Sequence, residues 1–221
     1  RTKDQLRDLP DVACFLEEYI PIEKEFACLG VRGSTGEVST YPVVGMRFHP
    51  EANQVEEVSV PSDLDPTTEK RVQEITVDLL EKLGHVGLLA VEFIIGPDGE
   101  LLVNEAALRP HNSGHIFSDT AYTPQFEQHI RAVCGMPLGS TRLRQAGSMI
   151  NLVGDADASG PVHYAGISEV LREEGVYPHL YGKKHTRPFR KMGHVNVVAD
   201  ELKEARERAA RIEKQLKIIA K

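Results

Sequence analysis

One short segment of the chain gathers side chains that could do chemistry directly behind an apolar run. Within residues 101–115 these groups are an amide, an acid, a guanidinium and two imidazoles: Asn104, Glu105, Arg109, His111 and His115. A buried strand seldom ends in so many charged groups for structural reasons, because unpaired charges are costly to bury. We therefore interpret this segment as a strand that delivers functional side chains to its end.

A second acid, Glu92, lies in the preceding apolar run, and the turn sequence GPDG joins the two runs. This pattern predicts a β-hairpin. If Ile95 pairs with Glu100, then Glu92 faces Val103, and Glu105 is its diagonal neighbour on the same face, about 7–8 Å away. Two such carboxylates repel each other unless a cation lies between them. The hairpin therefore predicts a site for Mg²⁺, which prefers oxygen ligands.

Other interpretations of these side chains stay open. Both glutamates could be solvated or paired with arginines, since one β-bulge would change the register. The spacing of His111 and His115 is that of a zinc pair, but Pro110 and the intervening Asn-Ser-Gly argue against the helix that such a pair needs. Arg109 with His111 on a loop suits a carboxylate or phosphate ligand. Loop histidines that bind only backbone groups are the plain alternative.

A cluster of cations lies in the sequence YGKKHTRPFRKMGH at residues 181–194. Its basic members are Lys183, Lys184, Arg187, Arg190 and Lys191. A run of charge is usually a solvated surface, but the interspersed Pro188, Phe189 and Gly193 indicate a shaped loop. We favour phosphate binding; RNA contact is the alternative, although aromatic stacking platforms are missing.

The elements that must position these groups follow from periodicity and turn residues. Residues 65–83 predict a helix that Asp65 caps and Gly84 ends. The segment 124–134 predicts a second helix, and the segment from 200 to the C-terminus predicts an amphipathic third. Two runs joined by GSTG within residues 24–46 predict a further hairpin.

Short strand-like pieces separated by loops follow residue 140. We therefore predict an α+β protein in two parts. Residues 1–138 form an antiparallel sheet with flanking helices, and residues 139–221 form a small strand-rich domain that ends in the amphipathic helix.

Composition excludes several classes of protein. The 221 residues, 41% of them hydrophobic, can bury one large core or two modest ones. No apolar run approaches the ~20 residues of a membrane span, and no signal peptide is visible. The three cysteines, Cys14, Cys28 and Cys134, form no CxxC pair, which indicates reduced thiols in a cytoplasmic protein. The formal net charge of −7 argues against nucleic acid as the main partner.

Three segments taken in order resemble one family. VEF with LLVNEAALRPHNSGH, then PQFEQHIRAVCGMPLG, then YGKKHTRPFRKMGH resemble the 5-(carboxyamino)imidazole ribonucleotide synthetases. These are the ATPase subunits of phosphoribosylaminoimidazole carboxylase, ATP-grasp ligases of purine biosynthesis. The resemblance extends from about residue 12 to the C-terminus and begins just after the family's glycine-rich lid loop. It implies the C-terminal part of an ATP-grasp fold, so we expect a fragment that is inactive alone.

The resemblance also implies roles by matching position. The implied ATP-binding residues are Glu17, Glu18, Tyr19, Ile20, Glu25, Asn104 and Glu105. The implied Mg²⁺ ligands are Glu92 and Glu105, in agreement with the hairpin argument. The implied catalytic and substrate-binding residues are Arg109, His111, Lys183 and Arg190.

The implied reaction joins bicarbonate to 5-aminoimidazole ribonucleotide at the expense of ATP. Mg²⁺ neutralises phosphate charge while a bicarbonate oxygen attacks the γ-phosphoryl group, which gives carboxyphosphate. The carboxyl group then passes to the exocyclic amine, and a closed lid protects it from water. The implied partners are these small molecules and, at full length, a second copy in a homodimer; neither nucleic acid nor a membrane is expected.

The sequence departs from the family pattern in three places. Leu108 replaces a proline, and Gly45, Met46 and Phe48 replace polar residues of a PVVEN-x-H pattern, so that His49 comes one position late. The sequence around His115 also differs. Two other hypotheses are a phospho-ligand or RNA-binding module that uses residues 181–194, and a metal hydrolase that uses Glu92, Glu105 and the histidines. Tight zinc would favour the hydrolase, and salt-sensitive RNA binding would favour the module.

Overall fold

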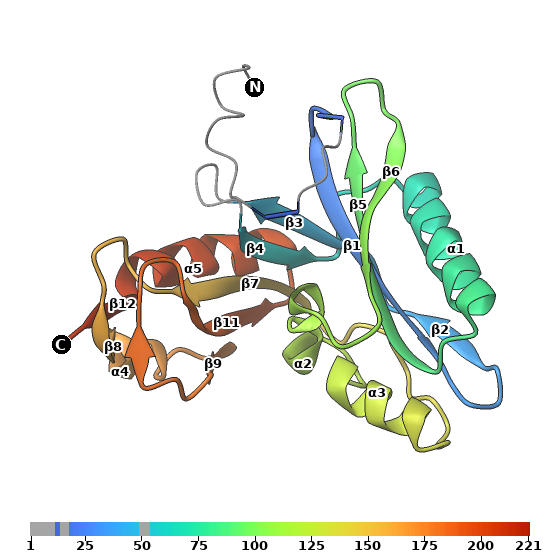
Figure 1. The fold of residues 1–221 in the computed structure, drawn as a ribbon. Coiled ribbons are helices and arrows are strands. Elements are labelled where there is room, and N and C mark those ends of the chain that lie inside the picture. The colour runs from blue at the N-terminus through green and yellow to red at the C-terminus, as the bar shows by residue number, and fades with distance from the viewer. Residues whose placement is uncertain (1–11, 14–17, 49–53) are drawn as a thin grey trace.

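A long antiparallel sheet organises this protein, which we describe from a computed structural model over residues 12–13, 18–48 and 54–221. Along the sheet the strand order is β6-β5-β1-β3-β4-β7-β11-β9, with β2 paired to β1 (Figure 1). These strands are β1 (Lys24–Arg32), β2 (Val38–Thr40), β3 (Val44–Phe48), β4 (Val55–Val60), β5 (Gly87–Ile95), β6 (Leu101–Ala107), β7 (Ala146–Val153), β9 (Val176–Leu180) and β11 (Lys191–Ala199).

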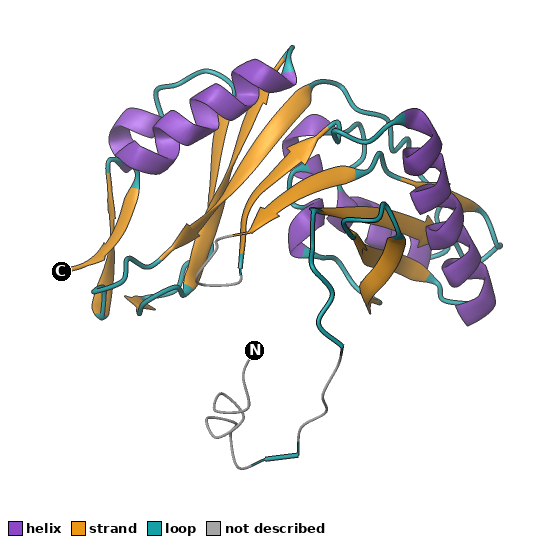
Figure 2. Ribbon diagram, turned by 90° about the horizontal axis from the view of Figure 1, so that it is seen from above, coloured by secondary structure: helices purple, strands orange, loops and turns teal. Residues whose placement is uncertain are grey.

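A small second sheet and several helices complete the described fold. The small sheet has the order β10-β8-β12. Its strands are β8 (Gly160–Ala165), β10 (His185–Thr186) and β12 (Lys217–Ala220). The α-helices are α1 (Pro66–Leu83), α2 (Phe117–Thr120), α3 (Gln125–Val133), α4 (Ile167–Val170) and α5 (Leu202–Gln215), and a short 3₁₀ helix, η2, covers Asn112–Gly114. Helices α1 and α5 pack on the large sheet at its two ends (Figure 2).

Alternation along the strands places the core on both faces of the sheet, because successive side chains point to opposite sides. In β1, Phe26 and Cys28 join a buried cluster with Val72 and Leu80 of α1. The intervening β1 residues Ala27 and Leu29 join another cluster on the opposite face, with side chains of α2. Both faces of β1 and β5 are therefore buried away from water, and this packing holds the β5–β6 hairpin in place.

The predicted helices are confirmed, with one correction. Asp65 accepts hydrogen bonds from the backbone of Thr67 and Thr68, and Gly84 ends α1 in the left-handed region. The C-terminal helix is shorter than predicted, since α5 ends at Gln215 and the last residues form β12. The β-branched Ile218 and Ile219 pair with β8, and Ile218 is buried there, so tertiary pairing overrides the helical period.

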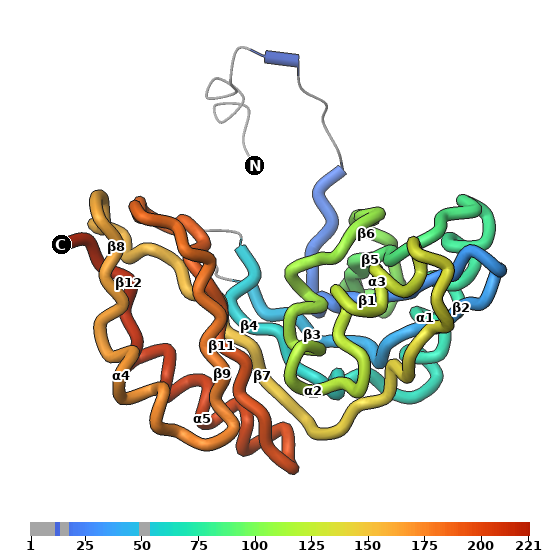
Figure 3. The backbone as a smooth tube through the Cα atoms, turned by 90° about the horizontal axis from the view of Figure 1, so that it is seen from below, coloured from blue at the N-terminus to red at the C-terminus, as the bar shows by residue number. Residues whose placement is uncertain are grey.

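The α+β architecture is confirmed as well. The large sheet continues through the predicted boundary between residues 138 and 139, because β4 pairs with β7. Figure 3 shows the blue-to-green elements and the orange-to-red elements as two halves on either side of β3 and β4. The division into two domains stays a prediction.

Two further observations concern the cysteines and the apolar character of the helices. Cys28 and Cys134 are free thiols, while Cys14 lies outside the described residues. Among the helices that the structure describes, none has both the length and the apolar character needed to cross a membrane.

Candidate functional site

The β5–β6 hairpin brings Glu92 and Glu105 directly opposite each other. The predicted register is wrong, because Ile95 pairs with Leu101 and not with Glu100. A register shift follows between Phe93 and Glu92, which leaves Asn104 as an extra residue of β6. The two glutamates are therefore direct partners, whereas the sequence predicts a diagonal pair.

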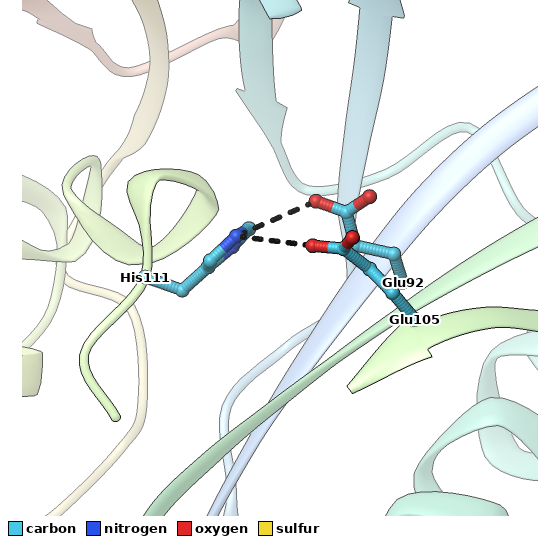
Figure 4. Close-up of side chains that lie close together, drawn as sticks. All are labelled: Glu92, Glu105 and His111. Atoms are coloured by element: carbon cyan, nitrogen blue, oxygen red, sulfur yellow. Dashed lines mark ion pairs between the residues drawn. The ribbon is translucent and has the colours of Figure 1, made fainter. Parts of the chain in front are cut away.

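The bulge decides the chemistry of the hairpin. With the observed turn and no bulge, Glu92 would face Asn104, and Glu105 would point to the opposite side of the sheet. The extra residue restores the alternation, so that both carboxylates point to one face (Figure 4). The shared face that the sequence predicts is thus present, although the pairing behind it differs.

His111 completes a cluster with the two acids. One ligand atom from each of Glu92, Glu105 and His111 lies within 4.8 Å of the others. The Nε2 atom of His111 is 3.6 Å from a carboxylate oxygen of Glu92 and 3.8 Å from one of Glu105 (Figure 4). His111 follows β6 and lies at the N-terminal end of η2, so the strand and its loop deliver the three groups together.

The two carboxylates in this cluster are only partly compensated by nearby groups. Burial, with the nearby carboxylates of Glu105 and Glu25, raises the pKa of Glu92 to about 7. A hydrogen bond from Asn104 and the charge of Lys191 oppose that shift. Burial and the adjacent Arg109 guanidinium lower the pKa of His111, which favours the neutral imidazole. Two carboxylates and a neutral imidazole around one space suit a divalent cation.

The zinc pair of His111 and His115 is absent from this arrangement. The residues between them form η2 and not an α-helix. Nδ1 of His115 contacts the side-chain amide of Gln125 at 2.9 Å, away from the carboxylate cluster.

Lys191 is the site residue that sequence reasoning missed. It lies at the start of β11, yet its charge acts on both Glu92 and His111. Lys183 donates a hydrogen bond from Nζ to the backbone oxygen of Lys191, 2.5 Å away. The basic segment 181–194 therefore meets the hairpin through Lys191. The basic residues of segment 181–194 were visible in the sequence, but no local feature distinguished Lys191 from its neighbours.

The other predicted site residues occupy varied positions. Glu25 on β1 acts on Glu92, and Ile20 lies near the backbone of Gly96 in the hairpin turn. Tyr19 is 76% exposed, and Glu18 is also exposed. Glu17 lies outside the described residues.

Two predicted arginines bond within their own loops. Arg109 donates to the oxygen of Pro110 at 3.1 Å, and Arg190 donates to that of His185 at 2.7 Å. Within the described segments, no ion pair or hydrogen bond links Arg190 to the cluster.

The departures from the family pattern fall on β3 and on the loop after β6. Met46 is buried opposite Glu25, and Phe48 packs against the same core cluster as Met46. Leu108 is 52% exposed, and His49 lies outside the described residues. The apolar residues of β3 therefore contribute to packing.

A stack of imidazoles lies beside the site and was also missed. His194 on β11 stacks on His115, with ring centres 4.7 Å apart, and on His179 of β9 at 4.5 Å. Burial lowers the pKa of His115 to about 4 and that of His194 to about 3. Nε2 of His179 is 2.8 Å from a carboxylate oxygen of Asp119. This stack joins the loop after β6 to the C-terminal strands.

Comparison with known proteins gives matches along most of the chain. The model of the ATP-grasp domain matches residues 2–126, and that of the phosphoribosylaminoimidazole carboxylase C-terminal domain matches residues 147–208. The N5-carboxyaminoimidazole ribonucleotide synthase of Bacillus subtilis (strain 168) is 42% identical over 182 residues, which are 82% of this chain and 46% of that protein. The enzyme of the same name from Aquifex aeolicus (strain VF5) is 38% identical over 89% of this chain and 51% of its own length.

Solved structures also match most of this chain. The N5-carboxyaminoimidazole ribonucleotide synthetase from Thermotoga maritima superposes with a TM-score of 0.91 at 39% identity, over 100% of this chain and 59% of that one. The synthase from Aspergillus clavatus in complex with ADP and 5-aminoimidazole ribonucleotide gives a TM-score of 0.78 at 25% identity, over 89% and 52% of the two chains. The chain spans about half the length of the curated relatives it matches.

Proposed function

The chain belongs to the ATP-grasp family, and from that premise we propose that it forms the cation- and substrate-binding part of a ligase that carboxylates 5-aminoimidazole ribonucleotide with ATP and bicarbonate. The observation that supports this proposal best is the convergence of Glu92, Glu105 and His111 beside Lys191. Relatives that carry the corresponding names match most of this chain, but the chain spans only about half of each. The activity is therefore proposed for the full-length gene product.

The carboxylates supply the proposed metal site. Glu92 and Glu105 would hold Mg²⁺, which when bound neutralises the charge on the ATP phosphates. Asn104, the extra residue of the bulge, hydrogen-bonds Glu92, and the resemblance also implies that it contacts ATP. Further ATP contacts proposed from the resemblance come from Glu17, Glu18, Tyr19, Ile20 and Glu25.

The carboxylation divides into two balanced steps. A bicarbonate oxygen attacks the γ-phosphorus, and ADP leaves as carboxyphosphate forms. The exocyclic amine then attacks the carboxyl carbon, and inorganic phosphate leaves with the electron pair of the broken C–O bond. We assign Arg109 to the carboxylate by charge-assisted hydrogen bonds. The phosphate that leaves can take up the proton that the amine loses, and we assign His111, whose pKa burial lowers, to the substrate.

The basic loop supplies the proposed contact with the ribonucleotide phosphate through Lys183 and Arg190. We expect Arg190→Ala in the full-length gene product to weaken ribonucleotide binding by about 1.5–3 kcal/mol, the range for losing a charged hydrogen bond. ATP affinity should hardly change. Arg187→Ala, in the same loop, is the control for the loss of one positive charge, because Arg187 is exposed. Calorimetry should separate the two variants. Equal losses for both ligands, or for both variants, would show that the loop is only a solvated surface.

A coupled assay of ADP release tests the function as a whole. The full-length gene product should release ADP only when Mg²⁺, bicarbonate and 5-aminoimidazole ribonucleotide are all present. Zinc-dependent hydrolysis without nucleotide would favour the hydrolase, and tight, salt-sensitive RNA binding would favour the binding module. A homodimer, a cytoplasmic location and the lack of nucleic-acid and membrane partners stay parts of the proposal.

A further inference from the structure

Two buried glutamines of α3 make the same type of contact with two different loops. Gln125 and Gln128 are both fully buried. The Oε1 atom of Gln128 accepts from the backbone N–H of Gly139, and its Nε2 donates to the oxygen of Gly139, each at 2.8 Å. Gln125 does the same to His111, with 3.0 Å at the backbone nitrogen and 2.9 Å at the oxygen. Each amide satisfies both backbone groups of a single loop residue.

The backbone fixes the orientation of the Gln125 amide. A backbone N–H can only donate and a carbonyl oxygen can only accept, so Oε1 must face the nitrogen of His111 and Nε2 its oxygen. The second hydrogen on Nε2 then points to Nδ1 of His115, 2.9 Å away. That nitrogen must accept and so carries no proton, which places the proton of the neutral ring on Nε2. The low pKa of His115, about 4, agrees with a neutral ring.

Close packing prevents the loop from moving toward the amide. A Cβ atom on Gly114, in the turn between the two histidines, would lie 2.4 Å from Oε1 of Gln125 and 2.3 Å from a methyl group of Leu29. Neither neighbour has room to yield, since Gln125 and Leu29 are both fully buried. The loop from His111 to His115 is thus closely packed against the Gln125 amide, which also hydrogen-bonds both histidines.

We propose that Gln125 is a positioning residue that holds His111 and His115 as one unit and so sets the His111 imidazole against Glu92 and Glu105. For its catalytic consequence this proposal rests on the proposed function. The hydrogen bonds of the amide to the cluster go to the backbone of His111, through which it acts on the imidazole. A site that depends on an accurately placed ligand loses binding when its support is removed.

Gln128 provides a matched control on the same helix. We would compare Gln125→Met with Gln128→Met in the full-length gene product, since methionine has a similar length and no amide. Both changes should lower stability, because each removes two buried hydrogen bonds to backbone groups, and Gln125→Met also removes the bond to Nδ1 of His115. In Gln125→Met the amide of His111 should exchange with solvent at least about 10-fold faster. In Gln128→Met the faster amide should be that of Gly139.

Cation binding should separate the two variants further. With Mn²⁺ alone as the probe, Gln125→Met should bind about 10-fold more weakly than the unmodified protein, and Gln128→Met should bind equally well. Equal Mn²⁺ affinities for both variants, or an unchanged exchange rate at His111, would overturn the proposal.

A second variant covers the case in which Gln125→Met does not fold. Gln125→Glu keeps an acceptor for the His111 amide, but its ionised form has no hydrogen for Nδ1 of His115. The ¹⁵N chemical shifts of the His115 ring should then show that the imidazole no longer keeps a single tautomer. Ring shifts equal to those of the unmodified protein would contradict the proposal. If the unmodified protein bound no Mn²⁺ and released no ADP, the proposed function would fail, while amide exchange and the His115 tautomer would still decide the role of Gln125.

Discussion

Glu92→Gln is expected to make the full-length gene product more stable at pH 8 without divalent cations and to lower its bicarbonate-dependent turnover by about 100-fold or more. The pKa of Glu92 is raised to about 7 in the folded protein from an ordinary 4.5. The folded state therefore holds this proton more tightly than the unfolded state does. Stability contributed by the protonated form is lost as the pH rises from about 4.5 through 7, and the full cost is present above that range.

The neutral amide removes this cost, which we expect to be worth roughly 1–3 kcal/mol at pH 8. It also removes a carboxylate that the proposed cation needs. Denaturant unfolding at pH 5 and pH 8, with and without Mg²⁺, should show the gain at pH 8 only, and Mg²⁺ should stabilise the unmodified protein more than the variant.

Glu57→Gln is the matched control for this prediction. The side chain of Glu57 is 15% exposed and that of Glu92 is 11% exposed, and both lie on strands of the large sheet. Glu57 is paired with Arg47 at 3.1 Å and accepts a hydrogen bond from Ser148. Its neutralisation should lower stability and leave turnover nearly unchanged. If Glu92→Gln instead lowered stability at pH 8 without cations, the interpretation of Glu92 and Glu105 as a pair of poorly compensated carboxylates would be wrong.

Lys191→Met is expected to lower ribonucleotide-dependent turnover by about 100-fold without weakening Mn²⁺ binding at pH 8. Lys191 lies close enough to Glu92 and His111 to affect the pKa of both, and burial lowers its own pKa. The half-buried ammonium of Lys191, beside a cation site, repels the cation and attracts an anionic substrate. Its removal should therefore hinder the substrate and leave Mn²⁺ affinity equal or higher.

Lys184→Met controls for the loss of one positive charge from the basic segment, since Lys184 is exposed. Steady-state kinetics should show little change in this variant. A similar loss of turnover in both variants, or weaker Mn²⁺ binding in Lys191→Met, would show that Lys191 does not act in the proposed site.

The hairpin shows how far local sequence reasoning extends. The turn is displaced by one residue from the predicted pairing, and the bulge at Asn104 adds a second displacement of one. Because side chains alternate with a period of two, the two displacements cancel, and both carboxylates reach the predicted face. The helices α1 and α3 were predictable because caps and periodicity are local signals. A bulge has no comparable local signature.

The rest of the site depends on contacts between distant parts of the chain. Lys191 meets His111 only because β11 joins the large sheet, and Gln125 reaches His111 only because α3 packs on β5. Neither residue differs locally from an ordinary surface lysine or helical glutamine. The end of α5 was missed for the same reason, since β12 forms only by pairing with β8. The roles of Arg190 and of Glu18–Ile20 stay predictions.

We propose that Glu92 and Glu105 hold the cation that orders the ATP phosphates. Crystals of the full-length gene product grown with ADP and Mn²⁺ would test it most directly by anomalous diffraction. We predict an anomalous peak between the two carboxylates, at Mn²⁺–oxygen bonding distance from both and from a phosphate oxygen of ADP. A nucleotide bound with its Mn²⁺ away from both glutamates would show that Glu92 and Glu105 do not hold this cation.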